Sequence, residues 1–149
     1  MPDGTTVLFV CLHGAAKSVV AARHLERLAA ARNLEVQAQS AGVDPDSAFP
    51  PHVVAGLASD GLVSPAGKPQ PATPELIESA DVVVTFGCDI TGLPTQGTVV
   101  RWDDVPAVSD GYDEARNAIV SRLPALLDTI ARVAAAKPVR PWCITTESG

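Results

Sequence analysis

Residues 7–18 read Val7-Leu-Phe-Val-Cys11-Leu-His-Gly-Ala-Ala-Lys17-Ser18. An apolar run ends at Cys11, and a loop of small residues then leads into an Ala-rich, helix-prone segment. This pattern predicts a buried parallel strand over residues 5–10 and a helix from Lys17 to about Asn33. The loop would lie at the carboxyl end of the strand and the amino end of the helix, where α/β sheets bind their ligands. We therefore expect an anion site there.

The chemistry expected of this loop follows from its place. Free N–H groups at a helix start carry partial positive charge, and Lys17 adds a full one. In that field Cys11 is expected to become a thiolate nucleophile, with Ser18 hydrogen-bonded to its sulfur and Gly14 in a left-handed conformation. The alternative is a buried core cysteine that merely ends a strand. The residues expected to surround an oxyanion are Leu12, His13, Gly14, Ala15, Ala16 and Lys17.

The spacing Cys11-x5-Lys17-Ser18, with its flanking segments, resembles the phosphate-binding loop of the low-molecular-weight protein tyrosine phosphatase family. That family includes arsenate reductases linked to thioredoxin or mycothiol. Weaker similarities follow in the family's order at Ser40-Ala-Gly42, Asp81-Val-Val-Val-Thr-Phe-Gly-Cys88 and Trp102-Asp103-Asp104. The resemblance implies a phosphatase I-like, three-layer α/β/α fold with a four-stranded parallel sheet in the order 2-1-3-4.

Lys17 departs from the family pattern, which carries arginine at this position. Arginine grips two oxygens of a phosphoryl group with a planar fork, whereas lysine is a point charge on a flexible stem. Losing one well-aimed transition-state donor typically costs about 100- to 1,000-fold in rate. The chain is therefore a slow phosphatase, an enzyme with a changed reaction, or a binding protein that has lost catalysis.

The family also places an Asp-Pro pair after the fourth strand, and this aspartate protonates the leaving oxygen. The corresponding stretch here is Asp103-Asp104-Val105-Pro106, in which the pair is not intact. Asp104 is the first candidate for the acid and Asp103 the second. As alternatives, both are solvated loop residues or one caps the last helix.

Cys88 is a possible redox residue. In the order 2-1-3-4, the strand that ends near it lies beside the first strand, so Cys88 and Cys11 would emerge at the same sheet edge. Residues 89–94 contain no further cysteine, so we do not expect a complete intramolecular thiol relay. Cys88 alone, thioredoxin or a low-molecular-weight thiol would then serve an arsenate reductase.

The remaining pattern alternates strands and helices, as in a parallel sheet covered on both faces. The expected strands are 34–40 at an edge, 81–87 and 97–102. The expected helices are Pro50 to Gly61, Thr73 to Ala80 and a final helix 112–135 that Pro124 should kink or split. We interpret His24 as a partly exposed helix residue. We interpret His52 as a residue in the first turn of its helix without a role in the site. Asp110 is a candidate cap for the last helix.

Composition limits the class of protein. The 149 residues are 46% hydrophobic with a net charge of −6, which predicts a folded domain over residues 1–136 and an irregular tail over 137–149. The acidic balance argues against nucleic acid and anionic membranes as partners. We expect a cytoplasmic protein without a secretory signal or membrane span. Three irregularly spaced cysteines favour neither a disulfide framework nor a zinc site, and nothing indicates a metal or cofactor.

The leading hypothesis is hydrolysis of a phosphate monoester of the phosphotyrosine type, with Cys11 as nucleophile. Arsenate reduction is the runner-up, because arsenate matches phosphate in shape and charge. A third hypothesis is an inactive or altered member that binds an oxyanion or a phosphoprotein. The sequence does not identify the substrate or the oligomeric state.

Overall fold

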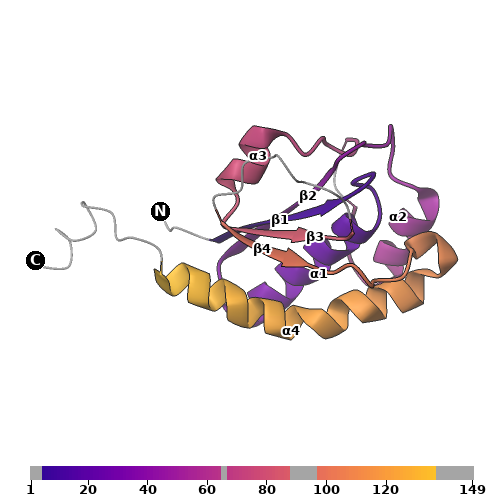
Figure 1. Cartoon of the computed structure of the whole chain (residues 1–149). Helices are drawn as coiled ribbons and strands as arrows, with labels where there is room; N and C mark the ends of the chain where they lie inside the picture. Colours follow the sequence, from indigo (N-terminus) through magenta and orange to yellow (C-terminus); the bar gives the residue numbers. More distant parts are fainter. Residues whose placement is uncertain (1–4, 65–66, 88–96, 137–149) are drawn as a thin grey trace, which may run out of the picture.

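The computed structural model describes residues 5–64, 67–87 and 97–136 of the chain. Its parallel sheet has the strand order β2-β1-β3-β4, which confirms the predicted α/β fold. β1 (Thr5–Cys11) lies in the middle beside β3 (Val82–Thr85), and β2 (Val36–Gly42) and β4 (Thr98–Arg101) form the edges. The carboxyl ends of all four strands therefore meet at one end of the sheet (Figure 1).

Helices cover both faces of the sheet (Figure 1). α1 (Lys17–Ala31) and α4 (Tyr112–Ala136) lie on one face and α3 (Pro74–Ser79) on the other, while α2 (Pro51–Ser59) packs beside α4. Side chains of β1 alternate between the two resulting cores, since side chains of a strand point to opposite faces in turn. Phe9 and Cys11 belong to the core under α1 and α4. The sequence places the nucleophile candidate on the face that α1 covers.

Local signals in the sequence set several boundaries. The Thr73 hydroxyl oxygen accepts a hydrogen bond from the Leu76 N–H over 3.2 Å, and Pro74 occupies the first turn of α3, as predicted. α2 ends at its cap residue Asp60, and Gly61 follows with φ +80°. That left-handed conformation favours glycine and confirms the predicted stop.

Pro124 does not split the last helix. α4 runs from Tyr112 to Ala136 without interruption and curves along one side of the molecule (Figure 1). A proline removes one backbone hydrogen bond, but the apolar face on both sides of it stays buried against the sheet and α1. That face consists of Ala115, Ile119, Leu123, Leu126, Leu127 and Ile130. Burial therefore holds the two halves in one helix.

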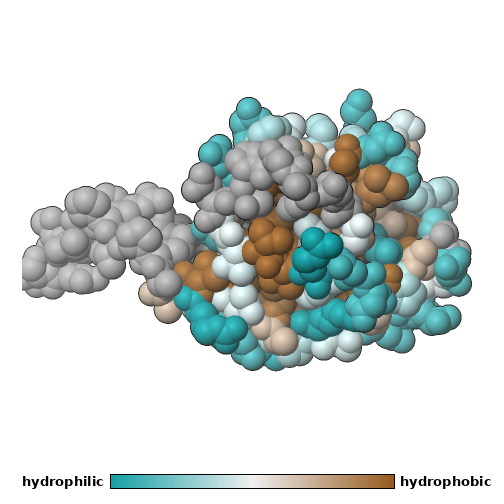
Figure 2. Space-filling view, in the orientation of Figure 1, coloured by the Kyte–Doolittle hydropathy of each residue, from teal (hydrophilic) through white to brown (hydrophobic). Residues whose placement is uncertain are grey.

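Figure 2 shows hydrophilic side chains over the outer face of α4 and a hydrophobic strip where β4 lies in Figure 1. Val99 of β4 is 41% exposed, as expected of an edge strand. In the part of the chain that the structure describes, no helix combines the length and apolarity that a bilayer span requires. Cys88, Cys143 and the tail 137–149 lie outside the described residues, so their predicted roles stay predictions.

Candidate active site

The backbone of the loop after β1 is oriented by the segment 43–46. The carbonyls of Cys11, Leu12 and His13 accept hydrogen bonds from three amides of that segment, over 3.1, 2.7 and 3.1 Å respectively. In a planar trans peptide the N–H points opposite to the C=O. Because these carbonyls turn outward, the amides of residues 12, 13 and 14 turn toward the inside of the loop. These three amides therefore lie on one side of the loop, which we call the cradle.

The Cys11 sulfur forms two short contacts within this part of the chain. The Gly14 N–H donates to Sγ over 3.2 Å, and the Ser18 Oγ lies 3.0 Å from it. Both contacts are buried, and each can stabilise a negatively charged sulfur. Cys11 is only 8% exposed but lines a surface cavity, so a small substrate can reach it.

Two glycines make the tight loop feasible. Gly14 has φ +63°, and a Cβ built on it would lie 2.4 Å from the Gly42 nitrogen. A Cβ on Gly42 would in turn lie 2.5 Å from the Gly14 nitrogen. The Ser40-Ala-Gly42 motif thus belongs to the site, because the end of β2 supports the loop at a backbone-to-backbone contact.

The amino end of α1 is open toward the same space. Its cap residue, Ala16, offers no side-chain hydrogen bond, and the first turn contains no acidic residue. The N–H groups of that turn are therefore available to an anion. Lys17 lines the cavity and forms no ion pair with any other residue that the structure describes.

The cavity has a volume of about 260 Å³ and two kinds of wall. Phe86, Ala107 and Val108 form its apolar wall, and Phe86 packs with Phe9 and the buried Trp102. Trp102 therefore packs beneath the site and is not among its lining residues. The polar wall consists of His13, Lys17, Asp46 and His52. The other lining residues are Cys11, Leu12, Ala15, Ala16 and Pro50.

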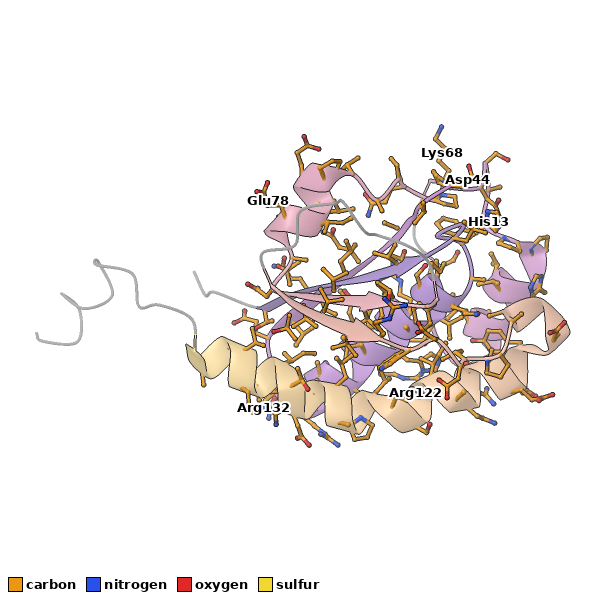
Figure 3. The ribbon with its side chains drawn as sticks, viewed as in Figure 1. His13, Asp44, Lys68, Glu78, Arg122 and Arg132 are labelled. Atoms are coloured by element: carbon orange, nitrogen blue, oxygen red, sulfur yellow. The ribbon has the colours of Figure 1, made fainter. Side chains whose placement is uncertain are left out.

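The two predicted acids are not among the residues that line this cavity. Asp104 pairs with Arg122 of α4 over 2.6 Å with its side chain 79% exposed, and Asp103 pairs with Arg101 over 3.3 Å. Val105 is buried in the core, and this anchor turns its two predecessors outward. Figure 3 places Arg122 well apart from His13. The loop segment that does face the cavity offers Ala107 and Val108.

The pair that His13 forms with Asp46 at the cavity was not predicted. The Nδ1 of His13 lies 3.3 Å from a carboxylate oxygen of Asp46 and 3.0 Å from the carbonyl oxygen of Asp44. Figure 3 shows His13 beside Asp44. His13 was expected to contribute as part of the loop, whereas no role was predicted for Asp46. The contact between the two loops is long-range, and no local pattern marks it.

The interpretation of His24 as a partly exposed residue is wrong. His24 is 6% exposed, and its Nε2 lies 3.1 Å from Asp60, which also accepts hydrogen bonds from the Tyr112 hydroxyl (2.8 Å) and Arg116 (2.7 Å). These four residues, the Asp60 cluster, join α1, the end of α2 and α4. None of them lines the cavity. Their long-range pairing could not be read from the helix pattern.

Burial and hydrogen bonding shift the pKa values in the Asp60 cluster. Burial lowers the pKa of His24 below 6.5, although its hydrogen bond to Asp60 opposes this. Partial burial favours a higher pKa for Asp60, but the hydrogen bonds from Tyr112 and Arg116 outweigh it and hold the pKa below 3.8. Burial, with the hydrogen bond to Asp60, raises the pKa of Tyr112. The neutral imidazole and the carboxylate are thus the stable forms at neutral pH.

Within the described ranges, no three His, Cys, Asp or Glu side chains are arranged to hold a metal ion. The site itself offers a thiol, backbone amides, one lysine and the imidazole-carboxylate pair. This set is suited to binding a tetrahedral oxyanion and attacking its central atom.

Comparisons with known proteins agree with this geometry. The family model described as "Low molecular weight phosphotyrosine protein phosphatase" matches residues 6–117. The thioredoxin-dependent arsenate reductase Cg_ArsC1' of Corynebacterium glutamicum is 29% identical with a TM-score of 0.73, over 86% of this chain. This chain spans 62% of the length of that structure. No match is found among curated proteins.

Two further solved structures represent the two activities. An arsenate reductase from Archaeoglobus fulgidus is 29% identical with a TM-score of 0.64, and the match covers 82% of this chain and 98% of that one. A low molecular weight protein tyrosine phosphatase from T. tengcongensis is 18% identical with a TM-score of 0.74. The match covers 85% of this chain and 99% of that one. At that identity, the second match supports the fold alone.

Proposed function

Because the chain belongs to the low molecular weight phosphotyrosine protein phosphatase family, we propose that it is a Cys11-dependent enzyme acting on a tetrahedral oxyanion, with arsenate as substrate. The observation that carries the proposal is the position of the Cys11 sulfur. It receives the Gly14 N–H, contacts the Ser18 hydroxyl and lines the cavity whose polar wall includes Lys17. This arrangement supports attack by sulfur on a bound anion.

Two considerations favour arsenate over a phosphate ester. The loop in which the family carries its aspartic acid faces the cavity with Ala107 and Val108, so it supplies no carboxylate to a departing alcohol or phenol. Arsenate needs only to release a hydroxyl group, and both matches at 29% identity are arsenate reductases. Lys17 is compatible with this substrate, because a point charge can still offset the charge of the bound anion.

In the proposed reaction, the Cys11 thiolate attacks arsenic, an As–S bond forms and an As–O bond breaks. The departing hydroxyl takes up one proton and leaves as water. A thiol from another molecule then attacks the Cys11 sulfur, which forms a mixed disulfide and releases arsenite. Arsenic gains two electrons and the two sulfurs are oxidised. We propose thioredoxin or a low-molecular-weight thiol as this partner; the first matches the name of the C. glutamicum relative.

The test is arsenite formation from arsenate with thioredoxin, mycothiol and glutathione systems supplied separately. We expect arsenite with at least one system and none with the Cys11→Ser variant. The same variant should still bind inorganic phosphate, since the amides and Lys17 remain. Failure of all three systems would contradict arsenate reduction.

Hydrolysis of a phosphate monoester is the second candidate. The cavity favours it through its volume of about 260 Å³ and its apolar wall at Phe86, against which an aromatic ring could pack. Release of 4-nitrophenol from 4-nitrophenyl phosphate, dependent on Cys11, would support it. If neither reaction occurs but phosphate binds equally to the parent and to Cys11→Ser, the chain is an oxyanion-binding member of the family without turnover.

A further inference from the structure

The departing oxygen in the proposed reaction needs a proton, and neither Asp103 nor Asp104 is placed at the cavity to give one. Four residues of the lining could hold or release a proton near Cys11. They are His13, Lys17, Asp46 and His52. The contacts made by His13 distinguish it from the other three.

The environment of the His13 ring fixes which nitrogen carries hydrogen. Its Nδ1 lies within 3.3 Å of two oxygens, the Asp46 carboxylate and the Asp44 carbonyl. Both are acceptors only, so Nδ1 must be the donor. Nε2 is therefore the nitrogen left to exchange a proton with a ligand.

The backbone of His13 also contacts the segment that carries Asp44 and Asp46. The Asp46 N–H donates to the His13 carbonyl over 3.1 Å, in addition to the side-chain contact. The ring thus has one hydrogen-bond contact, to the Asp44 carbonyl, and one ion-pair contact, to Asp46, and the same segment orients the amides of the loop. His52 also lines the cavity but forms no hydrogen bond with another described residue.

We propose that His13, oriented by Asp46 and the Asp44 carbonyl, is the proton donor to the oxygen that leaves when Cys11 attacks the substrate. This assignment rests on the proposed function. As the As–O bond breaks, the proton on His13 Nε2 passes to the departing hydroxyl, which leaves as water, and His13 becomes neutral. For a phosphate monoester the same proton would go to the leaving alcohol or phenol. His13 is then a catalytic residue and Asp46 a positioning residue.

Several titratable groups lie near His13 and can affect the pH dependence of the catalysed rate. They are Cys11 and Lys17 from its own loop, Asp44 and Asp46 from the segment after β2, and His52 from α2. A thiolate nucleophile makes the rate rise with pH, whereas an imidazolium donor makes it fall at higher pH. The falling limb is therefore the signature of the donor.

The experiment is the pH profile of kcat for Cys11-dependent turnover of arsenate, or of 4-nitrophenyl phosphate if that is what the enzyme uses. His13→Gln should lose the falling limb and about 100-fold in kcat, in line with typical general-acid contributions. Asp46→Asn should lower kcat by about tenfold but keep the falling limb, because His13 is still present while its Nδ1 loses the carboxylate that orients the ring.

Asp103→Asn is the control, since it removes an exposed carboxylate that does not line the cavity. It should retain the limb. Binding of inorganic phosphate by each variant checks that the loop is intact. A falling limb that persists in His13→Gln, or disappears in Asp104→Asn, overturns the assignment while leaving the proposed function in place. Absence of any Cys11-dependent turnover in the parent overturns both.

Discussion

Two polar regions lie along helix α1, and they differ in whether their polar groups are paired within the protein. At its amino end, the loop 11–17 has uncapped amides, and its one lysine has no ion-pair partner among the described residues. Farther along the helix, His24 belongs to the Asp60 cluster, whose carboxylate accepts bonds from α1 and α4. The first region is open to a ligand, and the second is already paired within the protein.

This comparison shows that shifted pKa values do not by themselves identify the functional site. Shifted pKa values occur in the Asp60 cluster, yet its residues do not line the cavity. Structural networks shift pKa values for the same physical reasons as catalytic groups do. The open region is recognised instead by the direction of its amides and by the surface access of its sulfur. We therefore expect variants of the two regions to separate binding from stability.

Gly14→Ala should have the largest effect. The new Cβ would meet the Gly42 backbone at 2.4 Å with φ at +63°, so we expect about 3 kcal/mol less stability and loss of phosphate binding. Gly67→Ala is the matched control, because Gly67 has φ +83° but nothing within 4 Å of the added Cβ. It should cost about 1 kcal/mol and leave binding intact. Equal costs in urea denaturation would contradict the close contact between the two glycines.

Asp60→Asn should lower the free energy of unfolding by about 2 kcal/mol, because it weakens charge-assisted hydrogen bonds from Arg116, Tyr112 and His24. Phosphate affinity should not change. Asp104→Asn is the comparison for stability, since its pair with Arg122 is 79% exposed at the carboxylate and should contribute less than about 1 kcal/mol. A lower phosphate affinity in Asp60→Asn would mean that the two regions are coupled.

Lys17→Arg should raise the catalytic efficiency of the site at the amino end of α1. The planar guanidinium can hold two oxygens of the anion and follow them in the transition state, so we expect about a tenfold higher kcat/KM. That gain equals about 1.4 kcal/mol of transition-state stabilisation. Unfolding of the variant should match the parent. An unchanged or lower kcat/KM would mean that this cavity has adapted to lysine.

The smallest expected effect is the pH dependence of stability that the Asp60 cluster contributes. The pKa of His24 is lowered from 6.5 on folding, so the unfolded chain binds the proton more readily as pH falls below 6.5. Its contribution is complete above 6.5 and is lost below it. The carboxylate of Asp60 contributes above 3.8 and is lost below that value. The free energies of unfolding of the parent and His24→Gln should be compared across this pH range. Their pH dependence should differ most just below pH 6.5, where the parent loses the contribution of His24.

The sequence predicted those parts of the molecule that depend on local patterns. The strand that ends at Cys11, the left-handed Gly14, the Thr73 cap and the stop at Gly61 all follow from neighbouring residues. The sheet order came from the resemblance to the family and is confirmed. Each of these features is fixed by a short stretch or by the fold as a whole.

Long-range pairs were not predictable in the same way. His24 meets Asp60, and His13 meets Asp46, only after the helices and strands have packed. The orientation of Asp103 and Asp104 depends on the burial of Val105, whose place in the core no local pattern identifies. The general acid is therefore the part of the site for which the structure changed our hypothesis most.

The central claim is that the loop 11–17 is an oxyanion cradle around the Cys11 sulfur. A crystal structure of the Cys11→Ser variant with arsenate or phosphate tests it most directly. We predict a tetrahedral anion above residue 11, held by the amides of the loop and the first turn of α1, with the Lys17 ammonium in contact. A loop left empty at saturating anion concentration, or with its amides directed away from a common centre, would contradict it.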